Sequence, residues 1–182
     1  MTTTILFGVP AASLLVWTVL YNGLVARRNG VENAFASLDA QLQKRYDLVP
    51  NLVETVKGYA THERGTLEAV TRLRNEAVGA SSSDLGKHEA ASAAIRQIFA
   101  LAENYPQLQA NTNFLHLQRS LNEIEEQISA ARRAFNASVT DYNNAVQTFP
   151  SSLVASSMGL QTRAWFEAED NAQQPISVGG AL

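Results

Sequence analysis

The sequence contains no cysteine, which excludes disulfides, thiolate zinc sites and lipid attachment through a thiol. Proline is scarce, with five residues in 182, and runs of β-branched residues are absent. The formal net charge is only −3, and basic residues do not gather around aromatic ones, so we expect no nucleic-acid partner. The remaining composition, rich in Ala, Leu, Glu, Gln and Arg, favours helices and predicts an all-α protein.

Charge is also absent from the start of the chain, because no charged side chain precedes Arg27. Residues 5–25 are mostly apolar, and at about 1.5 Å per residue a helix of that length covers roughly 30 Å, the hydrocarbon thickness of a bilayer. A cleaved secretory signal is the alternative, but residues 1–4 contain no basic residue and the apolar core is too long. The sequence therefore predicts a short N-terminus at 1–4 and a transmembrane helix at 5–25.

The residues that flank this run predict its orientation. Trp17 and Tyr21 have the amphipathic rings that favour the membrane interface, and the basic pair Arg27 and Arg28 follows the run. By the positive-inside rule, we expect the N-terminus outside the cell and the rest of the chain in the cytoplasm, with the lipid bilayer as a partner.

Four stripes of apolar residues at steps of three and four predict helices after this anchor. The longest stripe has the spacing of a coiled coil, and together the stripes predict an antiparallel four-helix bundle with long, coiled-coil-like helices at 26–150. The stripes comprise Val31, Phe35, Leu38, Leu42, Tyr46 and Val49; Leu67, Val70, Leu73 and Ala77; Ala91, Ile95, Ile98, Leu101, Ala102 and Tyr105; and Leu117, Leu121, Ile124, Ile128, Ala131, Phe135, Val139, Tyr142, Val146 and Phe149.

Glycine and proline mark the joints of this bundle. We expect the helix to continue through Gly30, so that the bundle projects from the bilayer as a stalk. Pro50 cannot donate a hydrogen bond to the carbonyl of Tyr46, and the sequence leaves open whether the helix kinks or reverses there. The remaining boundaries are a loop at 79–86 with Asp84 as a cap, a helix end at Pro106, a cap at Asn111 or Thr112, and a helix end at Pro150.

Polar residues surround the proline joint. One interpretation is a structural clasp that fixes the joint by hydrogen bonds to the freed backbone groups. The other is a surface for partner docking or self-assembly. Both interpretations remain open for the set Arg45, Tyr46, Asp47, Pro50, Asn51 and Glu54.

The C-terminal segment at 151–182 has a different character, with large apolar groups among small residues. We expect Leu153, Val154, Trp165 and Phe166 to fold against the bundle; the alternative is contact with a neighbouring subunit or the membrane surface. From Asn171 onward the composition predicts disorder unless an oligomer orders the chain.

No arrangement of residues predicts catalysis, a cofactor or a metal. The residues three before His62, His88 and His116 are not glutamates, as a metal site in a bundle would require, so we expect solvent-exposed histidines near helix ends. The acidic cluster of Glu123, Glu125 and Glu126 flanks apolar residues, which indicates a solvated face paired with nearby arginines.

The block at 45–63, RYDLVPNLVETVKGYATHE, closely resembles the signature of the LemA family of bacterial membrane proteins. Shorter matches are Tyr21-Asn22, Leu24-Val25 and Arg28-Asn29 before it, and Phe149-Pro150-Ser151, Val154-Ala155 and Trp165-Phe166-Glu167-Ala168 after it, whereas Met158-Gly159-Leu160 replaces a more aromatic segment. The resemblance implies one N-terminal membrane helix, an outside N-terminus, an antiparallel helical bundle and no assigned enzyme activity.

These expectations combine into one hypothesis: a non-enzymatic protein of the bacterial inner membrane whose bundle forms a homo-oligomer or scaffolds membrane protein partners. The alternative is a monomeric adaptor that regulates a membrane protease or a transport system in envelope maintenance.

Overall fold

A computed structural model describes residues 2–60, 63–78 and 85–166, apart from the side chains of residues 2–10, 77, 85 and 86. Its regular elements are all helices, which confirms the all-α prediction. In chain order they are α1 (Thr2–Lys57), α2 (Arg64–Val78), α3 (Leu85–Ala102), α4 (Pro106–Gln109), α5 (Thr112–Gln147) and α6 (Ser151–Ser157).

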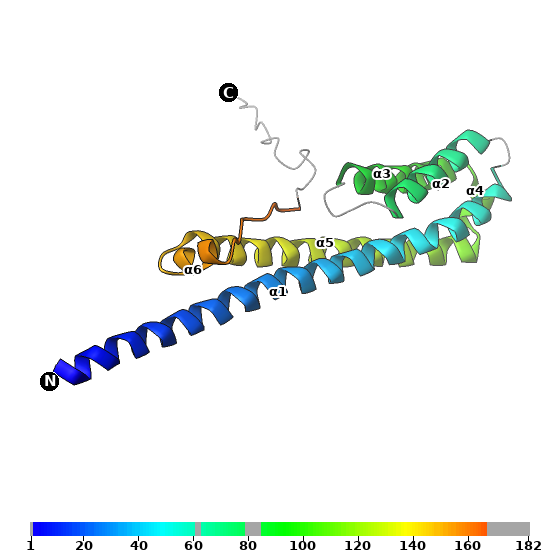
Figure 1. Ribbon diagram of the computed structural model, residues 1–182. Helices are drawn as coiled ribbons and strands as arrows, with labels where there is room; N and C mark the ends of the chain where they lie inside the picture. Colours follow the sequence, from blue (N-terminus) through cyan, green and yellow to red (C-terminus); the bar gives the residue numbers. More distant parts are fainter. Residues whose placement is uncertain (1, 61–62, 79–84, 167–182) are drawn as a thin grey trace, which may run out of the picture.

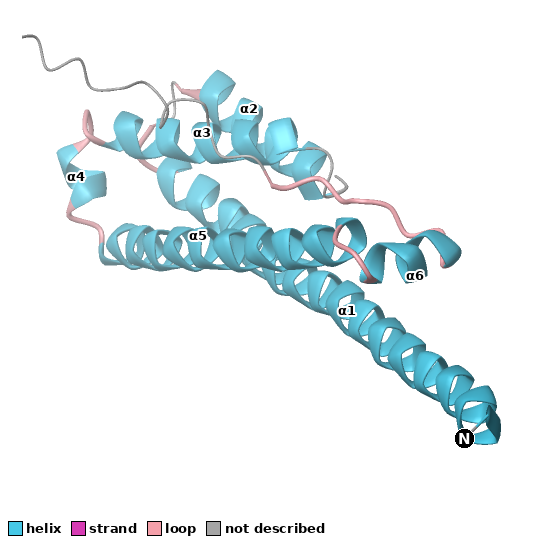
Figure 2. Ribbon diagram, turned by 90° about the vertical axis from the view of Figure 1, so that its left-hand side faces the viewer, coloured by secondary structure: helices cyan, strands magenta, loops and turns pink. Residues whose placement is uncertain are grey.

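Two long helices, α1 and α5, lie side by side and antiparallel, and they form the spine of the molecule (Figure 1). The shorter helices α2 and α3 pack against each other near the C-terminal end of α1, and α4 joins α3 to α5 (Figure 2). The short helix α6 lies at the opposite end of α5, beside α1. The four predicted helices are therefore present, but α2 and α3 cover only one end of a much longer hairpin.

The helix α1 is unbroken through both of its predicted joints. It continues through Gly30, as expected, and past Pro50 to Lys57. The chain reverses only after Gly58, where the amide groups of Tyr59 and Ala60 both donate to the carbonyl of Val56, at 3.0 and 2.9 Å. Pro50 therefore does not reverse the chain.

The core consists of three clusters along the hairpin. At the tip, α1, α2, α3, α4 and α5 all contribute, with Leu52, Val70, Ile98, Leu108 and Leu121 fully buried. In the middle, the α1 and α5 stripes meet each other, and Phe35 packs edge-to-face on Phe135 with ring centroids 5.9 Å apart. At the far end, Leu24 of α1 is covered by Val154 and Ala155 of α6. The predicted stripes thus contain most of the buried apolar residues among those that the structure describes.

The ends of α5 follow the sequence in part. Asn111 is its N-cap and accepts a hydrogen bond from the Phe114 amide at 3.0 Å, as predicted. The prediction that the stripe extends to Phe149 is wrong: α5 ends at Gln147, and Phe149 is 76% exposed. The predicted Asp84 cap and the segment from Asn171 lie outside the described residues.

Within the described part of the chain, no helix combines the length, hydropathy and low charge required to cross a membrane. The transmembrane helix that the sequence predicts at 5–25 includes residues 5–10, whose side chains lie outside that part.

Candidate functional site

Arg45 is the centre of a buried polar cluster where α1, α3 and α5 meet. Its side chain is only 2% exposed. Its Nη1 donates to Ser92 Oγ of α3 at 2.6 Å and to Glu125 Oε1 of α5 at 3.1 Å. Its Nη2 donates to Tyr46 Oη at 2.9 Å and to the His88 carbonyl at 3.4 Å. One guanidinium therefore ties three helices together, although its Nε has no hydrogen-bond partner among the described residues.

Tyr46 and His88 are two further buried residues of this cluster, and they contact each other. Tyr46 Oη lies 2.6 Å from His88 Nδ1, and the two rings are stacked with an interplanar angle of 14°. Because Tyr46 Oη accepts from Arg45, its own hydrogen is available for the imidazole. Burial raises the pKa of Tyr46 above its usual value, and the positive charge of Arg45 offsets part of that rise. The phenol is therefore held neutral.

His88 and Glu125 differ from their predicted roles. His88 is buried, so the prediction of a solvent-exposed histidine is wrong for this residue. Glu125 is half-exposed and pairs with Arg45 of α1, whereas a solvated face paired with arginines of its own helix was expected. A cation buried to this extent requires an acidic partner and nearby acceptors, and Glu125 and the His88 carbonyl supply these to Arg45 of α1.

The chemistry of the cluster is that of a structural joint. The Ser92 hydroxyl donates to the carbonyl of His88 at 2.9 Å rather than to an imidazole nitrogen. It is therefore not activated as a nucleophile by a neighbouring base. No group of three or more His, Cys, Asp or Glu residues within the described ranges is placed to hold a metal ion.

The backbone carbonyl that Pro50 leaves without a donor has a side-chain partner that the sequence did not reveal. Because proline has no amide hydrogen, the Tyr46 carbonyl lacks its helical donor. Arg74 of α2 fills this place, with its Nε 3.2 Å from the Tyr46 oxygen. The donor to the freed carbonyl therefore comes from another helix rather than from the residues around the proline.

The remaining predicted residues of the clasp lie on the opposite side of α1. Asp47, Pro50, Asn51 and Glu54 are exposed and follow one another at helical spacing. Asp47 accepts from Gln43 at 2.8 Å, and Glu54 pairs with Lys57 at 2.9 Å. The structure therefore divides the predicted set into two buried residues that join helices and a polar surface stripe.

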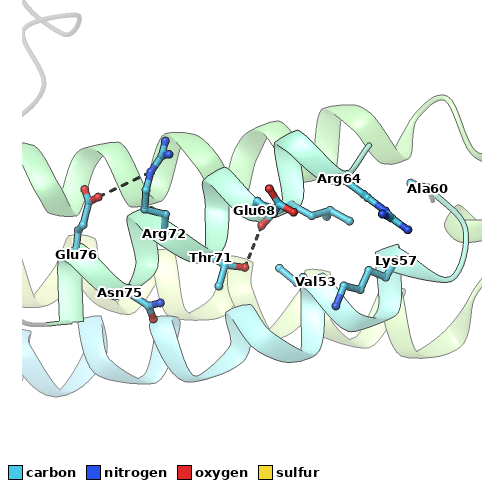
Figure 3. A pocket seen from close by; sticks show the side chains of 10 residues that line it. Val53, Lys57, Ala60, Arg64, Glu68, Thr71, Arg72, Asn75 and Glu76 are labelled. Atoms are coloured by element: carbon cyan, nitrogen blue, oxygen red, sulfur yellow. Dashed lines mark hydrogen bonds and ion pairs between the residues drawn. The ribbon is translucent and has the colours of Figure 1, made fainter. Parts of the chain in front are cut away.

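A groove of about 960 Å³ runs between the end of α1 and α2 (Figure 3). Its floor is apolar, with Val53, Ala60 and Leu67. Its rim carries both signs of charge, and Arg72 and Glu76 lie 3.9 Å apart along it. The charged side chains that line it are Lys57, Arg64, Glu68, Arg72 and Glu76.

The chain after α6 forms a strap, residues 160–166, that returns along α5 (Figure 2). Asn143 donates to the Arg163 carbonyl and accepts from its amide, each at 2.8 Å. Two turns earlier on α5, Asn136 makes the same pair of bonds with Phe166, again at 2.8 Å. Each asparagine therefore satisfies the backbone of the strap as a neighbouring strand would.

The strap also connects to α1, because Arg163 Nη2 lies 2.6 Å from Glu32 Oε1. Of the predicted tail contacts, Val154 and Phe166 are buried against the bundle. Leu153 is 61% exposed, and Trp165 is 52% exposed although its Nε1 donates to Thr140 at 3.0 Å. Two of these four side chains are therefore buried, and Trp165 contacts α5 from the surface.

The predicted membrane-orienting residues lie on the first half of α1, on exposed positions near α6. Trp17, Tyr21, Arg27 and Arg28 are all exposed. Arg27 Nη1 donates back to the Gly23 carbonyl at 3.2 Å. A second, more apolar groove of about 430 Å³ separates this part of α1 from α6, and it includes Val16, Trp17, Leu20 and Leu153.

These features define an all-helical protein with a long two-helix hairpin, a pair of short helices at its tip and a C-terminal strap. The model of the LemA family matches residues 34–179, from the second half of α1 through the tip, α5 and the strap, and the chain belongs to this family. The resemblance noted in the sequence is thereby confirmed.

Three similar proteins are distant in sequence but match most of the chain. Protein LemA of Metamycoplasma hominis is 26% identical over 152 residues, with 82% of this chain and 69% of that protein covered. Magnetosome protein MamQ of Magnetospirillum gryphiswaldense is 23% identical over 184 residues, with coverage of 86% and 68%. Magnetosome protein MamQ 2 of Paramagnetospirillum magneticum is 22% identical with the same coverage.

Proposed function

We propose that this protein is a non-enzymatic scaffold of the bacterial inner membrane, anchored by the first part of α1. Its helical hairpin assembles with further copies of the chain or holds other membrane proteins at a fixed distance from the bilayer. The observation that carries this proposal is the continuity of α1, which joins the uncharged segment before Arg27 to the buried core of the tip without a break.

The length of α1 supports a role as a spacer. At about 1.5 Å per residue, a helix from Thr2 to Lys57 extends over roughly 84 Å, far more than a bilayer needs. The part beyond Arg28 packs along α5. Two of the relatives are named as magnetosome proteins, which supports a role at an organised cellular structure rather than in metabolism.

The proposed topology places the start of α1 outside the cell and the tip in the cytoplasm. It rests on the basic pair Arg27 and Arg28, on the C-terminal side of the apolar run. Because the chain has no cysteine, Thr3→Cys and Ser83→Cys are clean reporters of sidedness. In intact cells an impermeant thiol reagent labels residue 3 and not residue 83 if the topology is right. Labelling at residue 83 would contradict it.

Self-assembly is supported by the anchor itself, since tethering in two dimensions raises the effective concentration of copies. The native mass of the full-length protein in mild detergent tests this idea. A discrete complex of several chains is the expected result. A monomer at all concentrations would overturn the self-assembly part of the proposal.

The second candidate is a monomeric adaptor that regulates a membrane protease or a transport system. The groove between α1 and α2 favours it, because an apolar floor with a rim of mixed charge is suited to an amphipathic segment of a partner (Figure 3). A monomer by mass that co-purifies in a fixed ratio with one membrane protein would support the adaptor.

A further inference from the structure

The α5–α6 turn lies beside the apolar part of α1, and this position has a consequence for the proposed anchor. Val154 and Ala155 of α6 bury Leu24, and Leu153 and Pro150 reach the groove that Val16 borders. All of these α1 positions precede Arg27. We propose that α6 and the turn before it enter the cytoplasmic leaflet beside the second half of the apolar run of α1. There Phe149 and Leu153 contact lipid acyl chains.

The proposed depth of α6 rests on the proposed anchor and on distance along α1. From Arg27 back to Val16 is eleven residues, or about 16 Å of helix, which is roughly half of the hydrocarbon thickness. If the bilayer surface lies near Arg27, any element packed between Leu24 and Val16 lies below that surface. The packing of α6 therefore fixes its depth.

Composition supports this depth, because residues 142–162 contain no charged side chain. The segment is the end of α5, the turn, α6 and the start of the strap. It is bordered by Asp141 and Arg163, and Arg163 pairs with Glu32 of α1 at 2.6 Å. Charged side chains therefore reappear at Asp141 and Arg163. The contact of Arg163 with Glu32 places this border a few residues beyond Arg27 along α1.

Exposed apolar side chains gather at this end of the molecule. Phe149 is 76% exposed and Leu153 is 61% exposed, although both are large. Among the described residues, most other large apolar side chains with comparable exposure lie on the apolar run of α1. The patch of Phe149 and Leu153 adjoins the apolar run of α1 through the groove, so the two form one continuous apolar surface. The run of α1 is the part that is proposed to face lipid. The occupant that we infer is the acyl region of the same leaflet.

Two serine hydroxyls of α6 donate to backbone carbonyls within the segment, which lowers the cost of placing them inside a leaflet. Ser151 Oγ donates to the Thr148 carbonyl at 2.8 Å, and Ser157 Oγ donates to the Val154 carbonyl at 2.7 Å. The helix ends at Ser157, and Gly159, two residues later, has φ of 63°, which lets the Leu160 amide donate to the Ala155 carbonyl at 3.0 Å. The chain then turns back towards Arg163, which pairs with Glu32 of α1.

Fluorescence quenching in a bilayer tests the proposal on the full-length chain. Single cysteines replace Phe149, Leu153, Leu15 or Asn122, are labelled with an environment-sensitive dye, and the protein is reconstituted in phosphatidylcholine–phosphatidylglycerol vesicles. A doxyl group on the lipid acyl chains is the quencher. Leu15→Cys reports the anchor, and Asn122→Cys, exposed near the tip, is the control that remains in water.

We expect a blue-shifted emission and a loss of fluorescence for dyes at 149, 153 and 15, and neither effect at 122. Quenching at 15 without quenching at 149 and 153 would overturn the inference while leaving the anchor intact. The absence of quenching at all three positions would overturn the anchor, and with it the inference. Quenching at 122 as well would contradict the assigned depth, because the tip would then also lie in lipid.

Discussion

Arg74 of α2 donates through Nε to the Tyr46 carbonyl of α1 at 3.2 Å, and this carbonyl is the one that Pro50 leaves without a helical donor. A side chain 28 residues away thus supplies the hydrogen bond that is missing in the middle of a long helix. The α1 helix continues past this position to Lys57, and the same bond joins α2 to α1.

We predict that Arg74→Met lowers the free energy of unfolding by about 1–3 kcal/mol, because it leaves a partly buried carbonyl unsatisfied. Chemical denaturation in mild detergent measures the change. The matched control is Arg72→Met, since Arg72 is exposed and its pair with Glu76 spans 3.9 Å, so a change within about 0.5 kcal/mol is expected.

A double-mutant cycle makes this test specific. Pro50→Ala restores an amide hydrogen at position 50, which can then donate to the Tyr46 carbonyl. In the Pro50→Ala background, Arg74→Met should therefore cost about 1 kcal/mol less than in the original chain. Equal costs in the two backgrounds would show that Arg74 does not act through this carbonyl.

Glu125 is the acidic partner of a cation that is 2% exposed. We predict that Glu125→Gln destabilises the protein by about 1–2 kcal/mol, because the neutral amide no longer offsets the buried charge of Arg45, while the exposure of Glu125 limits the effect. The neighbouring Glu126→Gln is the control and should change stability little, as Glu126 is exposed. Indistinguishable denaturation midpoints for the two variants would refute the role of Glu125.

Alkaline pH should weaken the joint through Tyr46. Burial raises the pKa of this phenol above its usual 10.0, so the unfolded chain releases the proton at lower pH than the folded protein. The contribution of Tyr46 is fully present below pH about 10 and is lost as pH rises through the folded-state pKa. We expect the free energy of unfolding to fall in that range.

Tyr46→Phe should make this alkaline loss smaller, whereas Tyr105→Phe should leave it unchanged. Unfolding curves recorded at several pH values above 9 provide the comparison. The same alkaline slope in the Tyr46→Phe variant and the unmodified chain would contradict the assignment.

The strap depends on Asn143, whose amide makes two 2.8 Å hydrogen bonds to Arg163. We predict that Asn143→Ala costs about 1–3 kcal/mol of stability and releases the strap. Hydrogen exchange at the Arg163 amide should become faster by a large factor, since its acceptor is lost. Asn144→Ala, next in sequence but exposed, is the control, and faster exchange in both variants would contradict the assignment.

Local patterns predicted the long elements well. The stripe from Val31 to Val49 identified the buried face of α1, and Asn111 was one of two candidate caps, with Thr112, between Pro106 and the stripe that starts at Leu117. These features depend on neighbours within one or two turns, so sequence alone contains the needed information.

Contacts between distant residues were not predictable in the same way. Arg45 is 80 positions from Glu125, 47 from Ser92 and 43 from the His88 carbonyl that it binds, and no periodic signal connects them. A weak signal did exist for the strap. Asn136 and Asn143 are two turns apart and each adjoins a residue of the apolar stripe, a place where a polar side chain requires a partner.

Exposure at the end of the hairpin was also missed. Phe149 continues the spacing of the α5 stripe, but the helix stops at Gln147, so the side chain leaves the core. Periodicity indicates which face is apolar and does not indicate where that face loses its partner helix.

The proposed anchoring of the protein by the first part of α1 rests on the uncharged run before Arg27. Extraction of membranes with alkaline carbonate tests it most directly, because this treatment releases peripheral proteins and leaves anchored ones in the pellet. We predict that the full-length protein stays in the pellet, and that replacement of Leu14 and Leu15 by lysine releases it. Release of the unmodified protein into the supernatant would contradict the account.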